Sequence, residues 1–429
     1  MALYPPLRWI PSLYFAMGLP FVVLNMVSAV LFKDLGISDA QIAFWTSLIM
    51  WPWTIKFLWS PFLELYRTKK FWVVGSQLLS GVLFGVAALS LQLPLFFSVS
   101  VAVFAVVAFS GATHDIAADG VYMSELSPAS QAKYIGWQGA FYNLAKLVAT
   151  GGLVWLAGWL YEGFSTSGTA SFDAYVRSWT VVLLILCVTL VALGLYHLRA
   201  LPSGGSASEG RSLRDGLSGL REVIGAFFTK RHIWYYIAFI ILYRLGEGFV
   251  MKIVPLFLKA DTASGGLGLT NQQIGLYYGT FGAGAFLLGS LLAGYYIAHR
   301  GLRRTLFILC CIFNIPFAVY ALLAWLQPQS MWIVGGGIVL EYFGYGFGFV
   351  GLTLFMMQQV APGRHQMAHY AFASGIMNLS VMLTGAVSGY LSDALGYGMF
   401  FLAVMLATVP AFLVTWFVPF TYDDKPNDK

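Results

Sequence analysis

Twelve long apolar runs follow one another along the 429 residues of this chain. Each is long enough for an α-helix to cross a bilayer, which takes about 20 residues, whereas the strands of a membrane barrel alternate over roughly ten. Only 10% of the residues are charged, compared with about 25% in soluble domains. The sequence therefore predicts an all-α membrane protein. Its helices are expected near 9–32, 39–63, 71–92, 95–124, 132–161, 176–198, 232–258, 271–298, 303–326, 330–360, 366–392 and 398–419.

The sixth and seventh runs are separated by a segment of different composition. It begins with Pro202-Ser-Gly-Gly-Ser-Ala-Ser, which is typical of a flexible linker. A weakly amphipathic stretch from Leu213 to Arg221 follows, which is typical of a surface helix. We expect an N-terminal six-helix bundle over residues 1–199, a cytoplasmic linker over 200–230 and a C-terminal six-helix bundle over 231–429.

The basic residues indicate how the chain is oriented. Only Lys33, Arg177 and Lys259 fall in the loops of one side, whereas most of the 24 Lys and Arg residues lie in the loops of the other side and in the linker. Cytoplasmic loops carry such an excess of basic residues. The sequence therefore predicts that both termini and the linker are cytoplasmic. The net charge of +6 reflects this topology, and no nucleic-acid partner is expected.

Two cytoplasmic loops repeat one pattern. Ser60-Pro-Phe-Leu-Glu-Leu-Tyr-Arg-Thr-Lys-Lys70 follows the second run, and Gly294-Tyr-Tyr-Ile-Ala-His-Arg-Gly-Leu-Arg-Arg304 follows the eighth. Both resemble the loop signature of the major facilitator superfamily, Gly-x-x-x-Asp-Arg-x-Gly-x-Arg-Arg, and Gly389-Tyr-Leu-Ser-Asp-Ala-Leu-Gly396 is a third echo. The resemblance implies two pseudo-symmetric halves and loops that help to lock one face closed. The gating residues it implies are Glu64, Arg67, Lys69, Lys70, Arg300, Arg303, Arg304 and Asp393, with ordinary membrane anchoring as the alternative.

Four acidic residues lie well inside the apolar runs, away from the first and last residue of each run. An ionised aspartate there costs at least about 2.5–3.5 kcal/mol on insertion scales, so it must face a cavity or a partner. Asp115 and Asp119 are four residues apart and share one helix face. We interpret Asp115, Asp119, Glu247 and Glu341 as proton-coupling candidates. The alternatives are that the aspartates only fasten helices together and that Glu247 forms a structural pair with Arg244, three residues away.

The basic and aromatic residues near the middle of the runs are candidates for solute binding, because transporter sites are expected near the bilayer midplane. Lys146, with Asn143 one turn earlier, suits an anionic or carbonyl-rich solute; the alternative is that Lys146 pairs with Asp115 or Asp119. Arg244 and Glu341 lie at a similar depth. Tyr142 and Tyr345 can stack on sugar rings, with helix packing as the alternative, and the glycines of run 335–348 allow close helix packing.

No other chemistry emerges from the sequence. Cys187, Cys310 and Cys311 all lie in apolar runs and suggest no disulfide frame. His365 and His369 are four residues apart but have no third ligand nearby in the sequence, so we expect no metal site and no cofactor. No nucleophile–base spacing is present, and we do not expect an enzyme.

Four motifs resemble one branch of the superfamily, the AmpG-like muropeptide permeases of the peptide, acetyl-coenzyme A and drug transporter group. They are Leu13-Tyr-Phe-Ala-Met-Gly-Leu-Pro20, Lys56-Phe-Leu-Trp-Ser-Pro61, Thr113-His-Asp-Ile-Ala-Ala-Asp119 and the stretch from Ala368 to Gly396. The resemblance implies a proton symporter of the bacterial inner membrane that imports N-acetylglucosaminyl-anhydro-N-acetylmuramic acid or its peptides during peptidoglycan recycling.

We expect this permease to work as a monomer whose partners are the small-molecule solute, protons and the lipid bilayer. Two alternatives remain open. The same branch includes importers of siderophores and carriers of acylated anions, and a chain of this architecture can also be a membrane sensor or scaffold that transports nothing.

Overall fold

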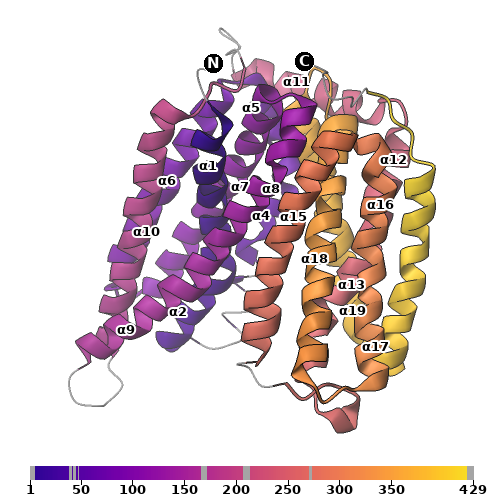
Figure 1. Cartoon of the computed structure of the whole chain (residues 1–429). Coiled ribbons are helices and arrows are strands. Elements are labelled where there is room, and N and C mark those ends of the chain that lie inside the picture. The colour runs from indigo at the N-terminus through magenta and orange to yellow at the C-terminus, as the bar shows by residue number, and fades with distance from the viewer. Residues whose placement is uncertain are drawn as a thin grey trace. The chain divides into compact units, whose positions relative to one another are not determined.

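The computed structural model describes residues 5–37, 41, 45–46, 48–165, 172–205, 213–269 and 273–422, and every regular element within these ranges is a helix (Figure 1). Within these described ranges, ten helical segments are long and apolar enough to cross a membrane. The predicted all-α membrane fold is therefore confirmed.

The first six predicted runs correspond to helices, several of which change their winding part-way. The third, fourth and sixth runs are single helices: α6 (Lys69–Ser90), α7 (Phe96–Glu125) and α10 (Phe172–Ala200). The first run is α1 (Pro6–Val22), a π-helical turn and α2 (Ser28–Asp34). The fifth is α8 (Pro128–Leu147), a π-helical turn and α9 (Val154–Phe164). The described part of the second comprises α4 (Trp51–Ile55), a 3₁₀ turn at Lys56–Leu58 and α5 (Ser60–Leu65).

The second set of six runs follows the linker helix α11 (Leu213–Phe228). The seventh run is divided into α12 (Ile233–Tyr243) and α13 (Leu245–Lys259). The eighth continues from a π-helical segment, Ile274–Phe281, into α15 (Gly282–Arg300). The ninth comprises α16 (Leu302–Asn314) and α17 (Ala318–Leu326), and the tenth is α18 (Met331–Phe355). The last two form α19 (Gln366–Trp416), which is interrupted by non-helical Gly396 (φ 70°, ψ 160°).

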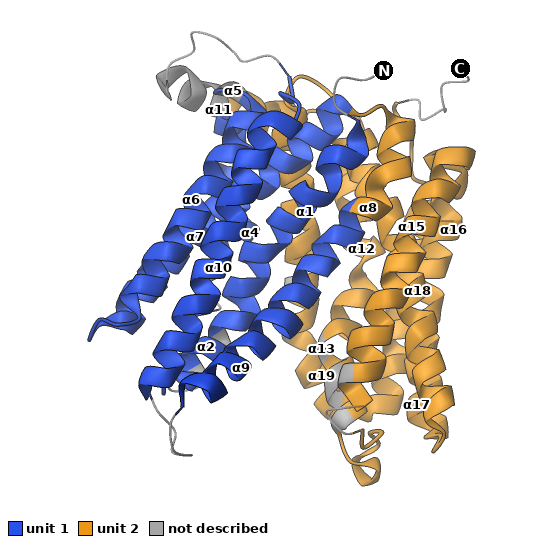
Figure 2. Ribbon diagram, turned by 60° about the vertical axis from the view of Figure 1, so that its left-hand side comes forward, with its two compact units in different colours: residues 1–125, 138–220 blue, residues 126–137, 221–429 orange. Residues whose placement is uncertain are grey.

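Contacts between residues divide the chain into two compact units (Figure 2). Unit 1 comprises residues 1–125 and 138–220, and unit 2 comprises residues 126–137 and 221–429. In unit 1, α6 packs between α7 and α10, and α1 packs on α7. In unit 2, α18 packs on α15 and α16, while α19 packs on α12 and α13. The bundle limits expected from the sequence, residues 199 and 231, stay a prediction.

The glycine-rich run of α18 allows its neighbours to approach closely. A Cβ at Gly346 would lie 2.1 Å from the carbonyl oxygen of Phe286 on α15, and one at Gly344 would lie 2.4 Å from that of Ile312 on α16. Real Cβ atoms do not approach another atom so closely. These glycines therefore serve close helix packing, the use expected for them from the sequence.

The linker helix α11 packs into unit 2 through its second half. Val223 and Phe227 are fully buried, and the Phe227 ring stacks on Phe372 of α19 with 5.0 Å between the ring centres. Lys230 follows this helix, and its ammonium group donates hydrogen bonds to the carbonyl oxygens of Val360, Ala361 and Pro362 at 2.6, 3.1 and 2.7 Å. Burial lowers the pKa of Lys230 to about 8, so the group keeps its charge at neutral pH. The amphipathic helix expected from residue 213 thus extends further and is part of unit 2 at its end.

Candidate functional site

Lys56 and Asp115 form an ion pair inside unit 1. Lys56 lies in the 3₁₀ turn between α4 and α5, and its Nζ is 2.6 Å from Oδ2 of Asp115 on α7. Both side chains are largely shielded, with 5% and 16% of their surfaces exposed. The lysine of the second run therefore compensates the charge of Asp115.

Asp119, one turn further along α7, has different partners. Its Oδ1 accepts hydrogen bonds from the Tyr14 hydroxyl at 2.9 Å and from Nε2 of Gln138 at 3.2 Å. The carboxyl group is buried, and no cation among the described side chains lies within 4.0 Å of it. The two aspartates share a helix face, as the spacing predicts, but only Asp115 is paired with a cation.

Lys146 lies on α8, near the end of the helix, with its side chain exposed. It forms no salt bridge with a described carboxylate, because the base that meets Asp115 is Lys56. The alternative that Lys146 pairs with Asp115 or Asp119 is therefore wrong in this structure. Sequence spacing alone could not decide about this alternative, because it does not show which faces of two separate helices meet.

Tyr142 and Asn143 lie one turn before Lys146 on α8. The Tyr142 ring lies 6.2 Å from that of Phe21, which in turn makes an edge-on contact with Trp53 at 5.2 Å. Nδ2 of Asn143 donates to the carbonyl oxygen of Gly139 at 2.9 Å, which leaves its Oδ1 as an acceptor. The structure thus places an aromatic group, an amide and an ammonium group in succession along α8.

Arg244 and Glu247 form an ion pair in unit 2. Arg244 sits at the break between α12 and α13, with φ −102° and ψ 9°. Its Nε and one terminal nitrogen each donate to a different carboxylate oxygen of Glu247, both at 2.5 Å. The Arg244 guanidinium also lies 5.1 Å from the centre of the Phe349 ring. Both charged side chains are buried, and the guanidinium is committed to Glu247, as the spacing of three residues suggested.

Glu341, on α18, has a neutral partner. Its Oε2 accepts a hydrogen bond from the Tyr320 hydroxyl of α17 at 2.8 Å. The carboxyl group is buried, and no salt bridge joins it to a cation in the described part of the chain. Tyr345, one turn further along α18, lies 6.3 Å from Tyr342 and 5.9 Å from Phe349, measured between ring centres. Tyr345 therefore belongs to an aromatic cluster that extends from Glu341 toward the Arg244 pair.

A buried chain of polar side chains in unit 1 was not predicted from the sequence. Ser12 hydrogen-bonds His197 Nε2, His197 Nδ1 bonds Oε1 of Gln77, and Nε2 of Gln77 bonds His114 Nε2, each at 2.9 Å. The chain joins α1, α10, α6 and α7. Polar residues within several otherwise apolar runs suggest that such a chain exists. They do not show which of these polar residues are in contact.

Two of the predicted gating residues of unit 1, Lys69 and Lys70, form hydrogen bonds with the start of the linker. Lys69 Nζ donates to the carbonyl oxygen of Gly204 at 2.7 Å, and Glu125 accepts from the Gly204 backbone N–H at 2.8 Å. The backbone N–H of Lys70 donates to Ser203. Arg67 has a left-handed backbone (φ 68°) and lies over the ring of Tyr66. Glu64 is half-buried in α5.

The predicted gating residues of unit 2 fall at two different ends of the unit. Arg300 ends α15, and Arg303 and Arg304 are exposed on the first turn of α16. Asp393 is exposed near Gly396, where neighbouring Gly398 packs against Trp325 at the end of α17. Because α16 and α17 form one membrane run, Asp393 lies at the opposite end of unit 2 from the three arginines.

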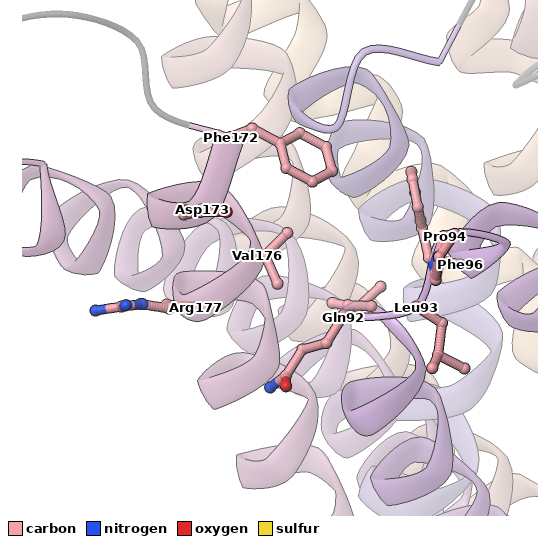
Figure 3. A pocket seen from close by; sticks show the side chains of 9 residues that line it. Gln92, Leu93, Pro94, Phe96, Phe172, Asp173, Val176 and Arg177 are labelled. Carbon is pink, nitrogen blue, oxygen red and sulfur yellow. The ribbon is translucent and has the colours of Figure 1, made fainter.

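A cavity of about 690 Å³ is present in unit 1, between the end of α6 and the start of α10 (Figure 3). Phe172, Val176 and Gln92 line it, and the Arg177 side chain extends away from the ring of Phe172. None of the predicted site residues lines this cavity, so we do not include it in the candidate site. Within the ranges that the structure describes, no group of three or more His, Cys, Asp and Glu residues is placed to hold a metal ion.

Comparison with known families establishes the class of the protein. The family model described as Major Facilitator Superfamily matches residues 12–365 and 242–429. The chain belongs to this superfamily. It is a multi-pass membrane protein and a secondary transporter, not an enzyme.

Relatives with similar sequences connect this superfamily member to the muropeptide permeases at a distance. The anhydromuropeptide permease of Escherichia coli K12 is 26% identical over 415 residues, which cover 93% of this chain and 77% of that protein. A Rickettsia bellii protein provisionally named transporter AmpG 1 is 20% identical over 381 residues, covering 86% of this chain and 87% of its own. The predicted resemblance to the AmpG-like branch is thus confirmed as a distant relationship.

Solved structures confirm the major facilitator fold along nearly the whole chain. The transporter FucP in its outward conformation matches with a TM-score of 0.69 at 14% identity, covering 97% of this chain and 99% of its own. A bacterial homologue of the iron transporter ferroportin, in an outward-facing state, matches with a TM-score of 0.67 at 14% identity, covering 96% and 98%. Identities this low show the shared fold alone.

Proposed function

We propose that this transporter imports a cell-wall-derived amino sugar or muropeptide, such as N-acetylglucosaminyl-anhydro-N-acetylmuramic acid, into the cytoplasm together with protons. It would work by alternating access in the bacterial inner membrane, with both termini in the cytoplasm. The distant relationship to a protein named anhydromuropeptide permease supports this solute class.

The observation that carries the proposal is the environment of Lys146. It is a base within an apolar run, its side chain is exposed, and it has no described carboxylate as a partner. A charge at membrane depth must face water or an opposite charge. The carboxylate of an anhydro-N-acetylmuramic acid unit would supply that charge, while Asn143 would accept from a sugar amide and Tyr142 would stack on a ring.

Unit 2 would contribute a second group of contacts. Glu341 and Tyr345 lie on one helix beside the buried Arg244–Glu247 pair, and this cluster would recognise the polar sugar groups. The candidates for proton coupling are Asp115, Asp119, Glu247 and Glu341. The basic loops with Glu64, Arg67, Lys69, Lys70, Arg300, Arg303 and Arg304 would act as gate elements on the cytoplasmic side, and Asp393 on the other.

Solute binding to Lys146 is tested by ligand-induced thermal stabilisation of the purified transporter. A ligand that binds only the folded protein raises its apparent stability with the logarithm of ligand concentration over Kd. We expect the anhydromuramyl disaccharide to stabilise the parent. Loss of a charge-assisted hydrogen bond worth about 1.5–3 kcal/mol raises Kd about 10- to 150-fold in Lys146→Ala. N,N′-diacetylchitobiose, which has no carboxylate, should bind both proteins equally.

Lys133→Ala is the matched control, because Lys133 is an exposed base on the first turns of the same helix. It should leave both affinities unchanged. Stabilisation by siderophores or acyl-coenzyme A in place of the disaccharide would overturn the solute class while leaving the transporter fold intact. A parent protein that none of these solutes stabilises would overturn the proposed solute class.

A further inference from the structure

Each unit contains the same set of three charged groups at membrane depth. In unit 1, Lys56 pairs with Asp115 while Asp119 accepts from the hydroxyl of Tyr14. In unit 2, Arg244 pairs with Glu247 while Glu341 accepts from the hydroxyl of Tyr320. One acid per unit therefore has a cation, and one is held by a tyrosine.

The two tyrosine-held acids occupy corresponding places in the repeat. Asp119 lies on α7, the fourth run of the first half, and Glu341 lies on α18, the fourth run of the second half. They are not at the same depth, since Asp119 is near the end of α7 and Glu341 is near the middle of its run. What the two units share is therefore the set of charges and the run that carries the tyrosine-held acid.

Charge balance distinguishes the two acids within each unit. If both acids of a unit are ionised, the one described cation beside them leaves one negative charge uncompensated. Such a buried charge is costly at membrane depth. Binding of a single proton removes the uncompensated negative charge. The acid that has no cation as a partner can take this proton without breaking an ion pair. Its tyrosine can keep donating to a carboxyl oxygen in either state.

The charges around each acid support this assignment. Near Asp119, the ionisable groups are Asp115 and Lys56, already paired, the Tyr14 hydroxyl and the Tyr142 hydroxyl of α8. Near Glu341, they are Glu247, which is paired with Arg244, and the hydroxyls of Tyr320, Tyr278, Tyr342 and Tyr345. The exposed Lys146 forms no salt bridge with Asp119.

We infer that each unit holds one exchangeable proton, on Asp119 in unit 1 and on Glu341 in unit 2, and that two protons accompany each solute. Asp115 and Glu247 stay ionised and paired. This inference rests on the proposed proton coupling for its transport step, but the protonation of the two acids is measurable without any solute.

Infrared difference spectroscopy of the purified transporter detects protonated carboxyl groups through their C=O stretching band. On titration between neutral and alkaline pH, we expect two carboxyl bands in the parent. Asp119→Asn and Glu341→Gln should each remove one band, and the double variant should remove both. Tyr14→Phe and Tyr320→Phe should shift one band each, because a hydrogen bond to the carbonyl oxygen lowers its frequency.

Asp115→Asn and Glu247→Gln are the comparison variants. The assignment of the protons to Asp119 and Glu341 would be overturned if the bands disappear in the comparison variants but persist in Asp119→Asn and Glu341→Gln. A parent protein that shows no carboxyl band would also overturn it. Because no solute is added, these outcomes do not depend on whether the disaccharide is the transported molecule. The proposed solute can therefore be wrong while the protonation of Asp119 and Glu341 is confirmed. Equally, the protonation can be wrong while the proposed solute is confirmed.

The ratio of protons to solute is a second, separate measurement. Reversal potentials in proteoliposomes should give two protons per disaccharide for the parent and one for Asp119→Asn or Glu341→Gln, wherever the variant retains flux. A ratio of one in the parent would contradict the inference.

Discussion

At the scale of single residues, the Arg244–Glu247 pair gives a direct stability prediction. Both side chains are buried and share two hydrogen bonds. Arg244→Gln leaves the Glu247 charge without compensation, and breaking a buried pair in this way costs about 3–5 kcal/mol. We expect a loss of that size in the free energy of unfolding, measured by denaturant titration in mixed micelles.

The double variant Arg244→Gln/Glu247→Gln provides the control. It removes both charges, so most of the lost stability should return. If the single and double variants are equally destabilised, the pair is not the source of the effect. If neither is destabilised, the Glu247 charge does not depend on Arg244 for its compensation.

The same residues show what can be predicted from sequence at this scale. Arg244 and Glu247 are three residues apart, so their contact depends only on helix geometry, and the sequence suggested it. Lys56 and Asp115 belong to different runs, and their pairing depends on how two helices are rotated and shifted relative to one another. Hydrophobic patterning places both residues in the membrane but does not set that rotation, so the partner of Asp115 was not identified.

At the scale of helices, the contact between α15 and α18 depends on glycine. A Cβ at Gly346 would lie 2.1 Å from a backbone oxygen of α15, whereas one at Gly336, earlier on the same helix, would meet nothing within 4 Å. We therefore expect Gly346→Ala to destabilise the protein by about 1–3 kcal/mol, because the two helices must separate.

Gly336→Ala is the matched substitution on the same helix. It introduces no clash and gives α18 a better helix former, so it should be neutral or stabilising by up to about 1 kcal/mol. Thermal unfolding of the two variants beside the parent measures both effects. Equal changes in the two variants would contradict the close packing of α15 and α18 at Gly346.

The positions of the helices were largely predictable from sequence, but their irregularities were not. Apolar runs of sufficient length mark each span because the bilayer demands it. The π-helical turns at Val23–Val27 and Val148–Leu153, and the break at Arg244, depend on how each helix fits its neighbours. Such turns often mark functional positions in helices, and Lys146 lies two residues before the second of them.

At the scale of the whole molecule, the fold follows from the repeat of two halves and from the number of spans. The repeated loop motifs and the twelve apolar runs predicted a major facilitator transporter, and the family match confirms it. A TM-score of 0.69 with FucP at 14% identity shows that this fold tolerates almost complete replacement of its residues. The solute, by contrast, depends on a few side chains and cannot be deduced from the fold.

We propose proton-driven import of an anionic amino sugar by this transporter. The measurement that tests it most directly is uptake of radiolabelled N-acetylglucosaminyl-anhydro-N-acetylmuramic acid into proteoliposomes with an inward proton gradient. We predict accumulation above the external concentration, abolished by a protonophore and strongly reduced in Lys146→Ala but not in Lys133→Ala. Equilibration that is indifferent to the gradient, or no uptake beyond that of empty liposomes, would contradict the claim.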